Sequence, residues 1–587
     1  MHTTLRSALV AAALVTSAAP HLSAQTTHKT TPTRKTASRK PAQPSLAEQI
    51  RQMHDDLQGQ IDGLKQQLAE RDARIQTLQA TANQQATTVA TQSQELTTTL
   101  QQNTDTLNAV KAQVDEVHSS SVAMASEVQD VQKSQEAMRH AIDQPASIHY
   151  KGITLTPGGF LAAESVWRQR AMNADIYTNF NATPYPGAGE AHTSEWVPSA
   201  RQSRLSFLAS GKVPFGTISG YFEGDFLSAG TTSNNLQTNS YTLRVRQAWA
   251  QAHMAHSTFT GGEMWTLLSE DKTKAMPGQE ALPLFFDGNL HVGYTYTRQA
   301  GFRYQQELTH QVTLAVALEN SQYQFSASNA PSNFFFGSAG AAGGLNNPSA
   351  NYTNQVAPDV IAKFSFDPGF GHYELGGVVR FFRDRYYPTT GSSADAQNDT
   401  KVGGGFVASA RFPVTSKASI GLHVVGGDGT GRYGASLLPD VTVHPNGTLE
   451  PLRNAQGLLS VEAHPNPKLD LFLYAGTEYV QRTTYMNSAG TLVGYAPITA
   501  NNSGCNVEAV PTSGSGYAPG SGACVGATRD ITQGSVGWLY RIYSGPAGKL
   551  QYGVAYSYLT RSGWAGVGGA PKATNNMVYT SFRYILP

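Results

Sequence analysis

The connections between strand-like segments after Pro145 constrain this chain more than any single motif does. From there to the end of the chain, apolar and polar residues alternate with a period of two, which is typical of β-strands with one apolar face. Leu205, Phe207 and Ala209, for example, are each separated by one residue. Short connections rich in turn residues alternate with long polar ones. This rhythm predicts a sheet with tight turns at one edge and long loops at the other.

The short connections contain Pro, Gly, Asn or Ser, which favour tight turns. They lie at 213–216, 367–371, 413–416, 465–467 and 544–548, with two weaker ones at 253–257 and 307–310. The long connections lie at 169–199, 267–291, 322–354, 429–454 and 483–529, with shorter members at 228–240, 385–400 and 562–572. These seven turns and eight loops separate about sixteen strands, and an outer-membrane barrel shows the same asymmetry because its periplasmic turns are short and its outer loops long.

A soluble β-sandwich or propeller also contains many short strands. Neither architecture needs alternating short and long connections, nor a set of long loops on one side. A membrane barrel also explains why several segments carry charge on the face opposite the apolar one, since its lumen is polar and its exterior meets lipid. The predicted fold class is therefore an all-β transmembrane barrel of about 16 antiparallel strands over residues 150–587, preceded by an α-helical coiled coil.

The N-terminus has the pattern of a secretion signal. Residues 1–24 contain one arginine, a short apolar run and a small-residue cleavage site, which together indicate a signal peptide. Residues 25–45 are rich in Thr, Ser, Pro and basic residues and contain too few apolar residues to order themselves, so we expect a flexible basic linker. No later segment reaches the ~18 uninterrupted apolar residues of a membrane helix, which leaves a soluble protein or a barrel.

Residues 46–144 show a different periodicity. Apolar residues recur with heptad spacing and no proline interrupts the segment, which predicts a coiled coil ending before Pro145. The seam of its second half includes Leu107, Val110, Val114 and Val117. β-branched residues at both seam positions favour more than two helices, and a trimer is the predicted count.

Charge and cysteine usage exclude several classes of function. The chain has 42 Lys+Arg against 41 Asp+Glu, so it lacks the basic excess of a nucleic-acid-binding protein. Cys505 and Cys524 lie close together in a polar stretch, and in an oxidising compartment they are expected to form a loop disulfide. Without nearby histidines they supply too few ligands for a metal. No HExxH, GxSxG or phosphate-loop motif occurs, so we expect neither an enzyme nor a cofactor.

The inward face of the predicted barrel is where function would lie. An arginine facing lipid near the bilayer midplane costs about 2–4 kcal/mol, so charged strand positions are expected to face the pore. Strand parity places the following residues there: Arg204, Arg244, Arg246, Arg303, Arg380 and Arg583, with Glu223, Asp225, Glu374 and Glu478 as opposing charges. Two interpretations stay open: the charges pair across the wall and only stabilise it, or an excess of arginine draws small anions through a constriction.

The loop at 269–287 combines charges with an apolar stretch that prefers burial. Its charged members, which we expect at a constriction, are Glu270, Asp271, Lys272, Lys274, Glu280 and Asp287. Its apolar members are Leu282, Leu284, Phe285 and Phe286. The loop either folds inward and narrows the pore or packs at a contact between subunits.

Four segments resemble successive strands of the DcaP-like trimeric outer-membrane porins: GYFEGDF at 220–226, LRVRQAW at 243–249, GGEMWT at 261–266 and TRQAGFRY at 297–304. The order of signal peptide, coiled coil and sixteen-strand barrel is also similar to that family. The resemblance implies a homotrimer, a periplasmic coiled coil and passage of small, often anionic organic solutes.

The resemblance also implies that Arg244, Arg246, Arg298 and Arg303 belong to a basic ladder in the pore. Arg298 and Arg303 have opposite parity, so both can face inward only if a bulge lies near Gly301. The long 483–529 loop with its cysteine pair matches nothing in the family pattern.

Two functions follow from these features. The first is a porin of the bacterial outer membrane that lets small solutes, with a bias to organic anions, diffuse passively, with its coiled coil in the periplasm. The second is a structural protein that tethers the envelope, in which the barrel is an anchor and the coiled coil and basic linker contact peptidoglycan. Conductance in a planar bilayer and cell-wall binding by residues 25–144 discriminate between them.

Overall fold

The computed structural model describes residues 98, 101, 104–121, 147–227, 241–337, 352–508 and 524–587. These residues belong to two compact units, Met1–Asp130 and Val131–Pro587. In the first unit, residues 104–121 form an α-helix on which Leu107, Val110, Val114 and Val117 are exposed. The signal peptide, the basic linker and the remainder of the predicted coiled coil lie outside the described residues, so self-association of the helix stays a prediction.

Among the described helical residues, none belongs to a helix that is both long and apolar enough to cross a membrane.

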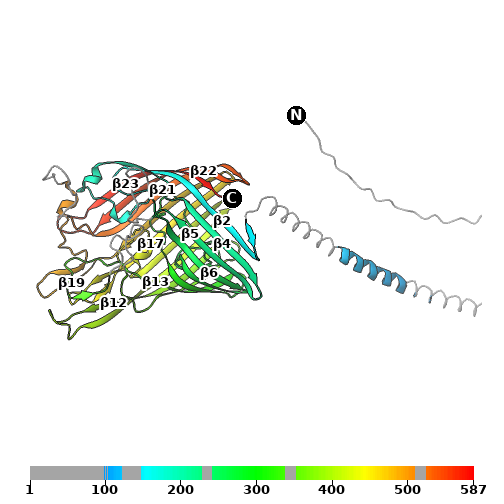
Figure 1. The fold of residues 1–587 in the computed structure, drawn as a ribbon, viewed down its shortest axis with the longest axis horizontal. Helices are drawn as coiled ribbons and strands as arrows, with labels where there is room; N and C mark the ends of the chain where they lie inside the picture. The colour runs from blue at the N-terminus through cyan, green and yellow to red at the C-terminus, as the bar shows by residue number, and fades with distance from the viewer. Residues whose placement is uncertain are drawn as a thin grey trace, which may run out of the picture. The chain divides into compact units, whose positions relative to one another are not determined.

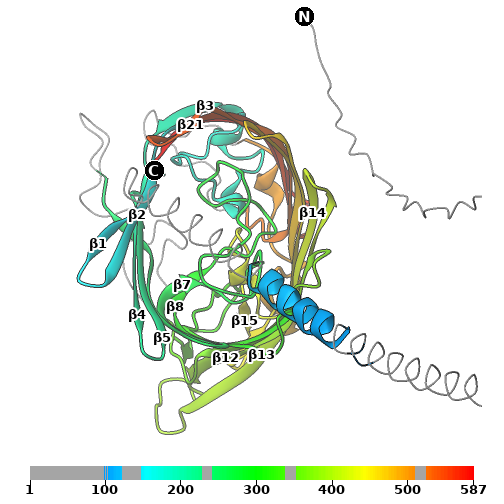
Figure 2. The same cartoon turned by 90° about the vertical axis from the view of Figure 1, so that its right-hand side faces the viewer.

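In the second unit, sixteen antiparallel strands of the described residues pair in chain order and close into a barrel (Figures 1 and 2). The strands of the barrel are β2 (Ile153–Arg168), β4 (Arg204–Val213), β5 (Gly216–Asp225), β6 (Arg244–Met254), β7 (Ser257–Trp265), β8 (Arg298–Glu307), β9 (Val312–Glu319), β11 (Asp359–Phe366), β12 (His372–Tyr386), β13 (Gln397–Thr415), β14 (Ala418–Asp428), β17 (Arg453–Asn466), β18 (Leu469–Val480), β21 (Thr528–Gly545), β22 (Gly548–Gly563) and β23 (Lys572–Ile585). The last strand closes on the first, with Phe160 opposite Ile585 and Arg168 opposite Met577.

Shorter strands and helices flank the sixteen strands of the barrel. The strand β1 (Ile148–Tyr150) pairs with the start of β2, β3 (Glu195–Ser199) pairs with its end, and β10 (Phe334–Phe335) pairs with β12. The long loops contain two hairpins, β15 (Val441–Val443) with β16 (Leu449–Pro451) and β19 (Thr483–Met486) with β20 (Leu492–Tyr495). They also contain the short 3-10 helices η1 (Phe180–Ala182), η2 (Gly189–His192), η4 (Gly431–Tyr433) and η5 (Ser503–Cys505).

The predicted alternation of connections is confirmed by the strand order. Each of the seven predicted short turns joins two neighbouring strands, such as β17 to β18 and β21 to β22. Each of the eight predicted long connections joins strands at the opposite end of the barrel. The strand boundaries differ by a few residues, since β12 and β13 extend to Tyr386 and from Gln397 into the predicted loop at 385–400.

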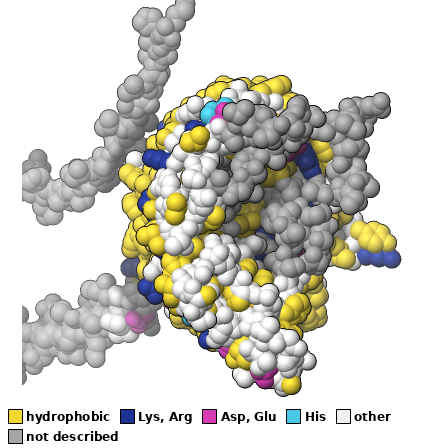
Figure 3. Space-filling model, turned by 90° about the vertical axis from the view of Figure 1, so that its left-hand side faces the viewer, with side chains coloured by type: hydrophobic (Ala, Val, Ile, Leu, Met, Phe, Trp, Pro, Cys, Tyr) yellow, Lys and Arg dark blue, Asp and Glu magenta, His cyan; other side chains and the backbone are white. Residues whose placement is uncertain are grey.

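The barrel wall is apolar outside and mixed inside. On β11, exposed Val360, Phe364 and Phe366 alternate with buried Asp359 and Lys363, which is the dyad pattern of a membrane barrel. At the loop end of the barrel, hydrophobic side chains gather along the flanks (Figure 3). The interior, by contrast, holds both ion pairs and a large apolar cluster, so the lumen is not polar throughout.

Candidate functional site

The segment between β7 and β8, residues 266–297, runs inside the ring of strands. Its residues contact inward-facing side chains far around the barrel, from Lys363 on β11 to Ser535 on β21 and Tyr579 on β23. Figure 2 shows this segment and other loop segments inside the ring. Of the two expectations for the 269–287 loop, the structure places it inward.

The first part of the loop is held to the barrel wall by ion pairs between side chains. The Glu270 carboxylate accepts from Arg411 on β13 at 2.8 Å, and Asp271 pairs with the Lys363 ammonium group at 2.6 Å. Lys363 also pairs with Glu374 on β12 at 2.8 Å and donates to the Ser269 carbonyl. Burial of these charges is tolerable only because each is paired.

The remaining predicted loop charges have different environments. The Lys274 ammonium group pairs with Glu307 at 2.7 Å, and the Glu280 carboxylate accepts from the Gly278 amide at 3.0 Å. Asp287 accepts from the Thr178 amide and from the Tyr579 hydroxyl, whereas Lys272 is exposed. Lys272 therefore presents its charge to solvent, whereas the partly exposed Lys274 is paired with Glu307.

The second part of the loop is fixed by aromatic packing. The Phe285 ring lies 4.9 Å from Tyr579 and 6.3 Å from Phe472, and Phe286 also meets Phe472 edge-on. The Leu284 amide donates to the Tyr474 hydroxyl at 2.8 Å. The inward positions Phe472 and Tyr474 of β18 thus receive the apolar stretch of this loop, whereas the inward Asp470 and Glu478 lie nearer the two ends of the strand.

Burial also shifts the pKa values of loop groups. It raises the pKa of the Glu270 and Asp287 carboxyls, although Arg411 opposes this effect at Glu270 and hydrogen bonds oppose it at Asp287. It lowers the pKa of His291 to about 4. His291 Nδ1 lies 2.9 Å from the Val292 carbonyl oxygen and Nε2 lies 2.9 Å from the Ser535 hydroxyl oxygen, so the ring is held by two hydrogen bonds.

A second group of charges lies on β23, β2, β4, β5 and β6, with one member on β8; we call it the basic wall. It consists of Arg204, Arg244, Arg246, Arg298 and Arg583 with Glu164, Glu223 and Asp225. These eight side chains include five arginines and three carboxylates, and Glu263 on β7, which interacts with Arg298, is a fourth carboxylate, so the formal excess is one positive charge. Arginine is always charged at physiological pH, so this excess is permanent.

The ion pairs of the basic wall are unequal. Arg246 is 4% exposed and bridges Glu223 at 2.6 Å and Asp225 at 2.7 Å. Arg244 pairs with Asp225 at 2.8 Å, whereas Arg204 reaches Glu223 only at 3.6 Å. The side chains of Arg204 and Arg244 remain 20% and 16% exposed. Arg246 and Arg244 therefore share the two carboxylates, and Arg204, with only its long contact to Glu223, is the most available of the three arginines.

Aromatic rings flank the arginines. The Arg204 and Arg583 guanidinium groups lie 5.2 Å and 4.6 Å from the Phe160 ring centre. Arg298 lies 4.9 Å from Trp265 and 5.4 Å from Tyr296. Such contacts hold a cation without consuming its hydrogen-bond donors.

The bulge expected near Gly301 is absent, because β8 pairs with β7 and β9 without a register shift. Arg298 is instead the first residue of β8, where it lies opposite the buried Trp265 with its guanidinium group over that ring. The register shift lies instead between Glu223 and Gly224 on β5, opposite the extra residue Arg246 on β6. As a result Trp249, which simple alternation puts with the lipid-facing residues, is buried, and its ring centre lies 5.2 Å from that of Tyr221. A single bulge reverses the parity of the rest of the strand.

Arg303 and Arg380 do not belong to the basic wall, which corrects their assignment to the pore ladder. Arg303 is 1% exposed and donates to the carbonyls of Trp265 and Ala275, so it holds the inward loop. Arg380 is completely buried between Asp359 and Asp440. Both face inward as parity predicts, but loops cover them.

The alternation pattern was not used to predict three further inward-facing charges, Lys363, Arg411 and Glu164. Lys363 has the same parity as Asp359 and Ile361 on β11, so the alternation alone could have placed it inside. Glu164 accepts from Arg583 and from the Ser581 hydroxyl across the closing pair of strands. It could not be paired with Arg583 before the closure of the barrel was known.

Cys505 and Cys524 are joined by a disulfide in the loop between β18 and β21. The Cys505 carbonyl accepts from the Gly187 amide, and the Tyr185 hydroxyl donates to the Gly526 carbonyl. The disulfide closes one long loop, and the two hydrogen bonds join residues beside it to the loop between β2 and β4. Among the described residues, no group of three or more His, Cys, Asp or Glu side chains could hold a metal ion.

No protein-family model and no curated protein matches this chain. Among solved structures, the outer membrane channel DcaP of Acinetobacter baumannii is similar with a TM-score of 0.52 and 14% identity, covering 75% of this chain and 99% of that chain. An anion-selective porin from Comamonas acidovorans has a TM-score of 0.38 and 9% identity, covering 74% and 100%. OmpF of Salmonella typhi in complex with daunomycin has a TM-score of 0.40 and 10% identity, covering 75% and 100%. The DcaP-like resemblance is therefore confirmed at the level of the fold.

Proposed function

We propose that this chain is an outer-membrane porin that lets small solutes diffuse passively and favours small organic anions. The observation that carries the proposal is the excess of arginine on the basic wall. A closed barrel with an apolar exterior suits a bilayer, and its short turns are assigned to the periplasm and its long loops to the outside. The likeness of the fold to the DcaP channel supports the same function.

Anions are attracted because the basic wall combines fixed positive charge with limited exposure to water. Electrostatic interactions are stronger in such a setting than in bulk water. Two arginine nitrogens, Arg204 Nε and Arg298 Nη1, are buried without a hydrogen-bond partner among the described residues. Guanidinium groups bind carboxylates in a bidentate manner, and the Arg204 and Arg244 side chains, 20% and 16% exposed, are those that we expect a passing carboxylate to meet.

The inward loop is proposed to set the width of the pathway. It is held by ion pairs at one part and by aromatic packing at the other, so its course is fixed rather than flexible. Lys272 is the member that we assign to the pathway itself, because its side chain is exposed.

We assign the N-terminal region to the periplasm as a coiled coil that makes the protein a homotrimer. Residues 104–121 support this assignment, because their helix exposes an apolar stripe at heptad spacing. Contact of the basic linker with peptidoglycan belongs to the alternative function of an envelope tether. A barrel without conductance, together with binding of residues 25–144 to cell wall, would favour that alternative.

The test is the reversal potential of single channels in a planar bilayer under a salt gradient. We expect anion selectivity in the native protein and a clear reduction in Arg204→Gln, because Arg246 still neutralises Glu223 in this variant. Lys212→Gln, an exposed position at the short-turn end of β4, is the matched control. Cation selectivity that survives replacement of Glu223 and Asp225 by their amides would overturn the anion bias.

A further inference from the structure

The barrel has a polar cavity at its short-turn end. The cavity has a volume of about 440 Å³ and is lined by Lys417, His464, Asp470 and Arg541 together with the turn residues 465–467. These residues come from the turn between β13 and β14, from the turn between β17 and β18, and from β21 shortly before its own turn. The cavity shares no lining residue with the inward loop or with the basic wall.

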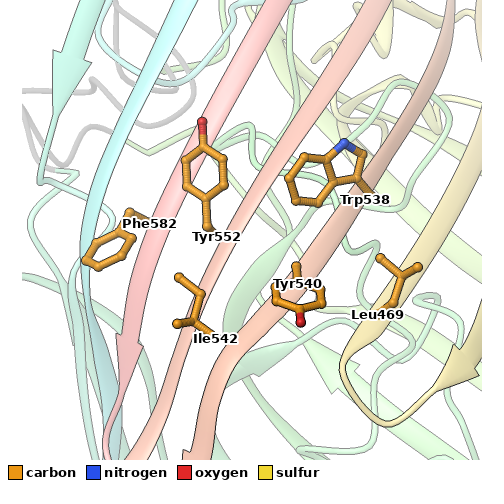
Figure 4. Close-up of a pocket in the computed structure, with 6 residues that line it drawn as sticks. All are labelled: Leu469, Trp538, Tyr540, Ile542, Tyr552 and Phe582. Atoms are coloured by element: carbon orange, nitrogen blue, oxygen red, sulfur yellow. The ribbon is translucent and has the colours of Figure 1, made fainter.

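Strand alternation places the cavity on the lumen side of the wall. Figure 4 shows Tyr540 and Ile542 among the side chains that line an apolar groove on the outer wall. Arg541 lies between them in the chain, so its side chain points to the lumen. Its partner Asp470 lies opposite the buried Leu539 and shares that inward face. The charged groups of the cavity therefore belong to the mouth of the pore.

Hydrogen bonds join the segments that form the cavity. The His464 amide donates to the Lys417 carbonyl at 2.6 Å, which connects β17 to the turn before β14. The Arg541 amide donates to the Lys468 carbonyl at 2.7 Å, and Arg541 Nη1 donates to the Pro467 carbonyl at 3.0 Å. Because its turns are tied to one another and to β21, the cavity is formed before any ligand enters.

The lining of the cavity carries a positive excess. Its one carboxylate, Asp470, is 4% exposed and is occupied by His464 at 2.6 Å and by Arg541. Lys417 is exposed, and its ammonium group has no ion-pair partner among the described residues. With His464 counted as neutral, Lys417, Arg541 and Asp470 sum to one positive charge. The available donors are the Lys417 ammonium group and the remaining N–H groups of Arg541, whose side chain is 25% exposed.

The next carboxylate along β17 is engaged elsewhere. Glu462 accepts from the Tyr474 hydroxyl at 2.7 Å and pairs with Arg411 at 3.5 Å. Neither partner lines the cavity. Glu462 therefore does not take up the donors of Lys417 or Arg541.

The cavity adjoins the basic wall around the barrel. Arg583 of the basic wall lies opposite Gln551, and Gln551 lies opposite Arg541. Neighbouring strands are about 5 Å apart, so two strand spacings place the backbones of Arg583 and Arg541 about 10 Å apart. An anion that leaves Arg583 toward the short turns therefore meets Arg541 as the next guanidinium group in this direction.

We infer that the cavity is a second binding site for the carboxylate groups of permeating solutes, at the periplasmic mouth of the pore. The inference rests on the proposed function, which supplies both the solute and the orientation of the barrel. Arg541 and Lys417 donate to the carboxylate, as charged donors do in such pairs. A monovalent carboxylate matches the single positive charge of the lining, whereas a dianion would meet the nearby Asp470 with uncompensated charge.

The test is NMR of the full-length protein in detergent, labelled with 15N-histidine, while sodium acetate replaces sodium chloride at constant pH and ionic strength. The ring signals of His464 are assigned by their loss in His464→Gln. We expect acetate to shift these signals in a saturable manner, and sodium sulfate to bind more weakly. Tighter binding of sulfate than of acetate would overturn the assignment to carboxylates.

Two variants separate a built site from general attraction of anions. Lys417→Gln should weaken acetate binding by up to about fivefold, the range of an exposed ion pair. Lys468→Gln is the matched control, because this exposed lysine of the neighbouring turn does not line the cavity. Arg541→Gln combined with Asp470→Asn keeps the net charge and leaves no charge unpaired, but it should abolish the saturable shift because the guanidinium donors are lost.

Folding of each variant is checked by its migration on SDS gels before and after heating. Three results would overturn the inference: no saturable shift in the native protein, equal weakening in Lys417→Gln and Lys468→Gln, or native affinity in the double variant. Anion-selective conductance without a shift at His464 would overturn this site and leave the porin proposal standing. Saturable acetate binding in a protein without conductance would contradict the porin proposal and leave the carboxylate site intact.

Discussion

Two walls inside this barrel carry charged residues at inward strand positions, yet they differ in how those charges are partnered. On β11, β12 and β13, the side chains of Lys363 and Glu374 are fully buried, and their partners include the inward loop. On the basic wall, Arg204 and Arg583 remain 20% and 18% exposed, and arginines outnumber carboxylates. The same strand parity thus produces a loop anchor on one wall and an available positive surface on the other. Net charge and exposure, rather than the direction of the side chain, separate the two roles.

The largest effect is expected at the loop anchor. Lys363→Met would leave Asp271 buried without its cation and Glu374 with only His372 beside it, at a cost of about 3–5 kcal/mol. We expect a lower free energy of unfolding and larger single-channel conductance, since the loop loses its attachment to β11. Lys272→Met, in the same loop but exposed, serves as the control in denaturant titration, and Lys212→Met, at the short-turn end of β4, serves as the control in bilayers. Native conductance in the Lys363 variant would mean that the aromatic contacts alone hold the loop.

Acid should also act on the loop. The folded-state pKa of His291 is about 4 against an ordinary value of 6.5, because burial disfavours the charged ring. The unfolded state therefore binds the proton first, so the stability from the neutral ring is complete above pH 6.5. It is lost as the pH falls to about 4, by on the order of 3 kcal/mol.

The measurement for His291 is the pH dependence of the unfolding free energy between pH 7 and 4, compared with His291→Gln. The variant should lose less stability over this range. The raised pKa values of Glu270 and Asp287 have the opposite sign, but both carboxyls are present in both proteins, so the comparison isolates the histidine. Parallel pH profiles would show that His291 does not titrate with unfolding.

The smallest effect on stability is expected on the basic wall. Arg204→Gln removes a 3.6 Å ion pair of a partly exposed arginine, which contributes at most about 1 kcal/mol. Selectivity should nevertheless fall, because the positive excess falls. Arg246→Gln is the contrasting variant, since it leaves Glu223 and Asp225 buried and should destabilise the barrel. Equal loss of stability in the Arg204 and Arg246 variants would contradict the claim that Arg204 is available while Arg246 is a structural ion-pair partner.

Much of the architecture was predictable from local patterns. Turn residues at the short connections and polar stretches at the long ones predicted the number and order of the strands. Alternation placed Arg204, Glu223 and Asp225 inside, because one face of each strand must meet lipid. It failed at Trp249, where the bulge at Arg246 changes the parity, since nothing in the local sequence marks the extra residue.

The sequence by itself determined a barrel with a charged interior, because the period of two and the alternating connections depend only on neighbouring residues. Only the tertiary structure decided which charges are available. Arg303 and Arg380 face inward as Arg204 does, but neither is available to a solute. The inward loop covers Arg303, and a loop carboxylate and loop carbonyls enclose Arg380. Partnership between strand and loop residues distant in sequence, such as Lys363 with Asp271, follows from closure of the barrel and from the path of the loop inside it. Neither the closure of the barrel nor the path of the loop can be derived from the spacing of residues in the sequence.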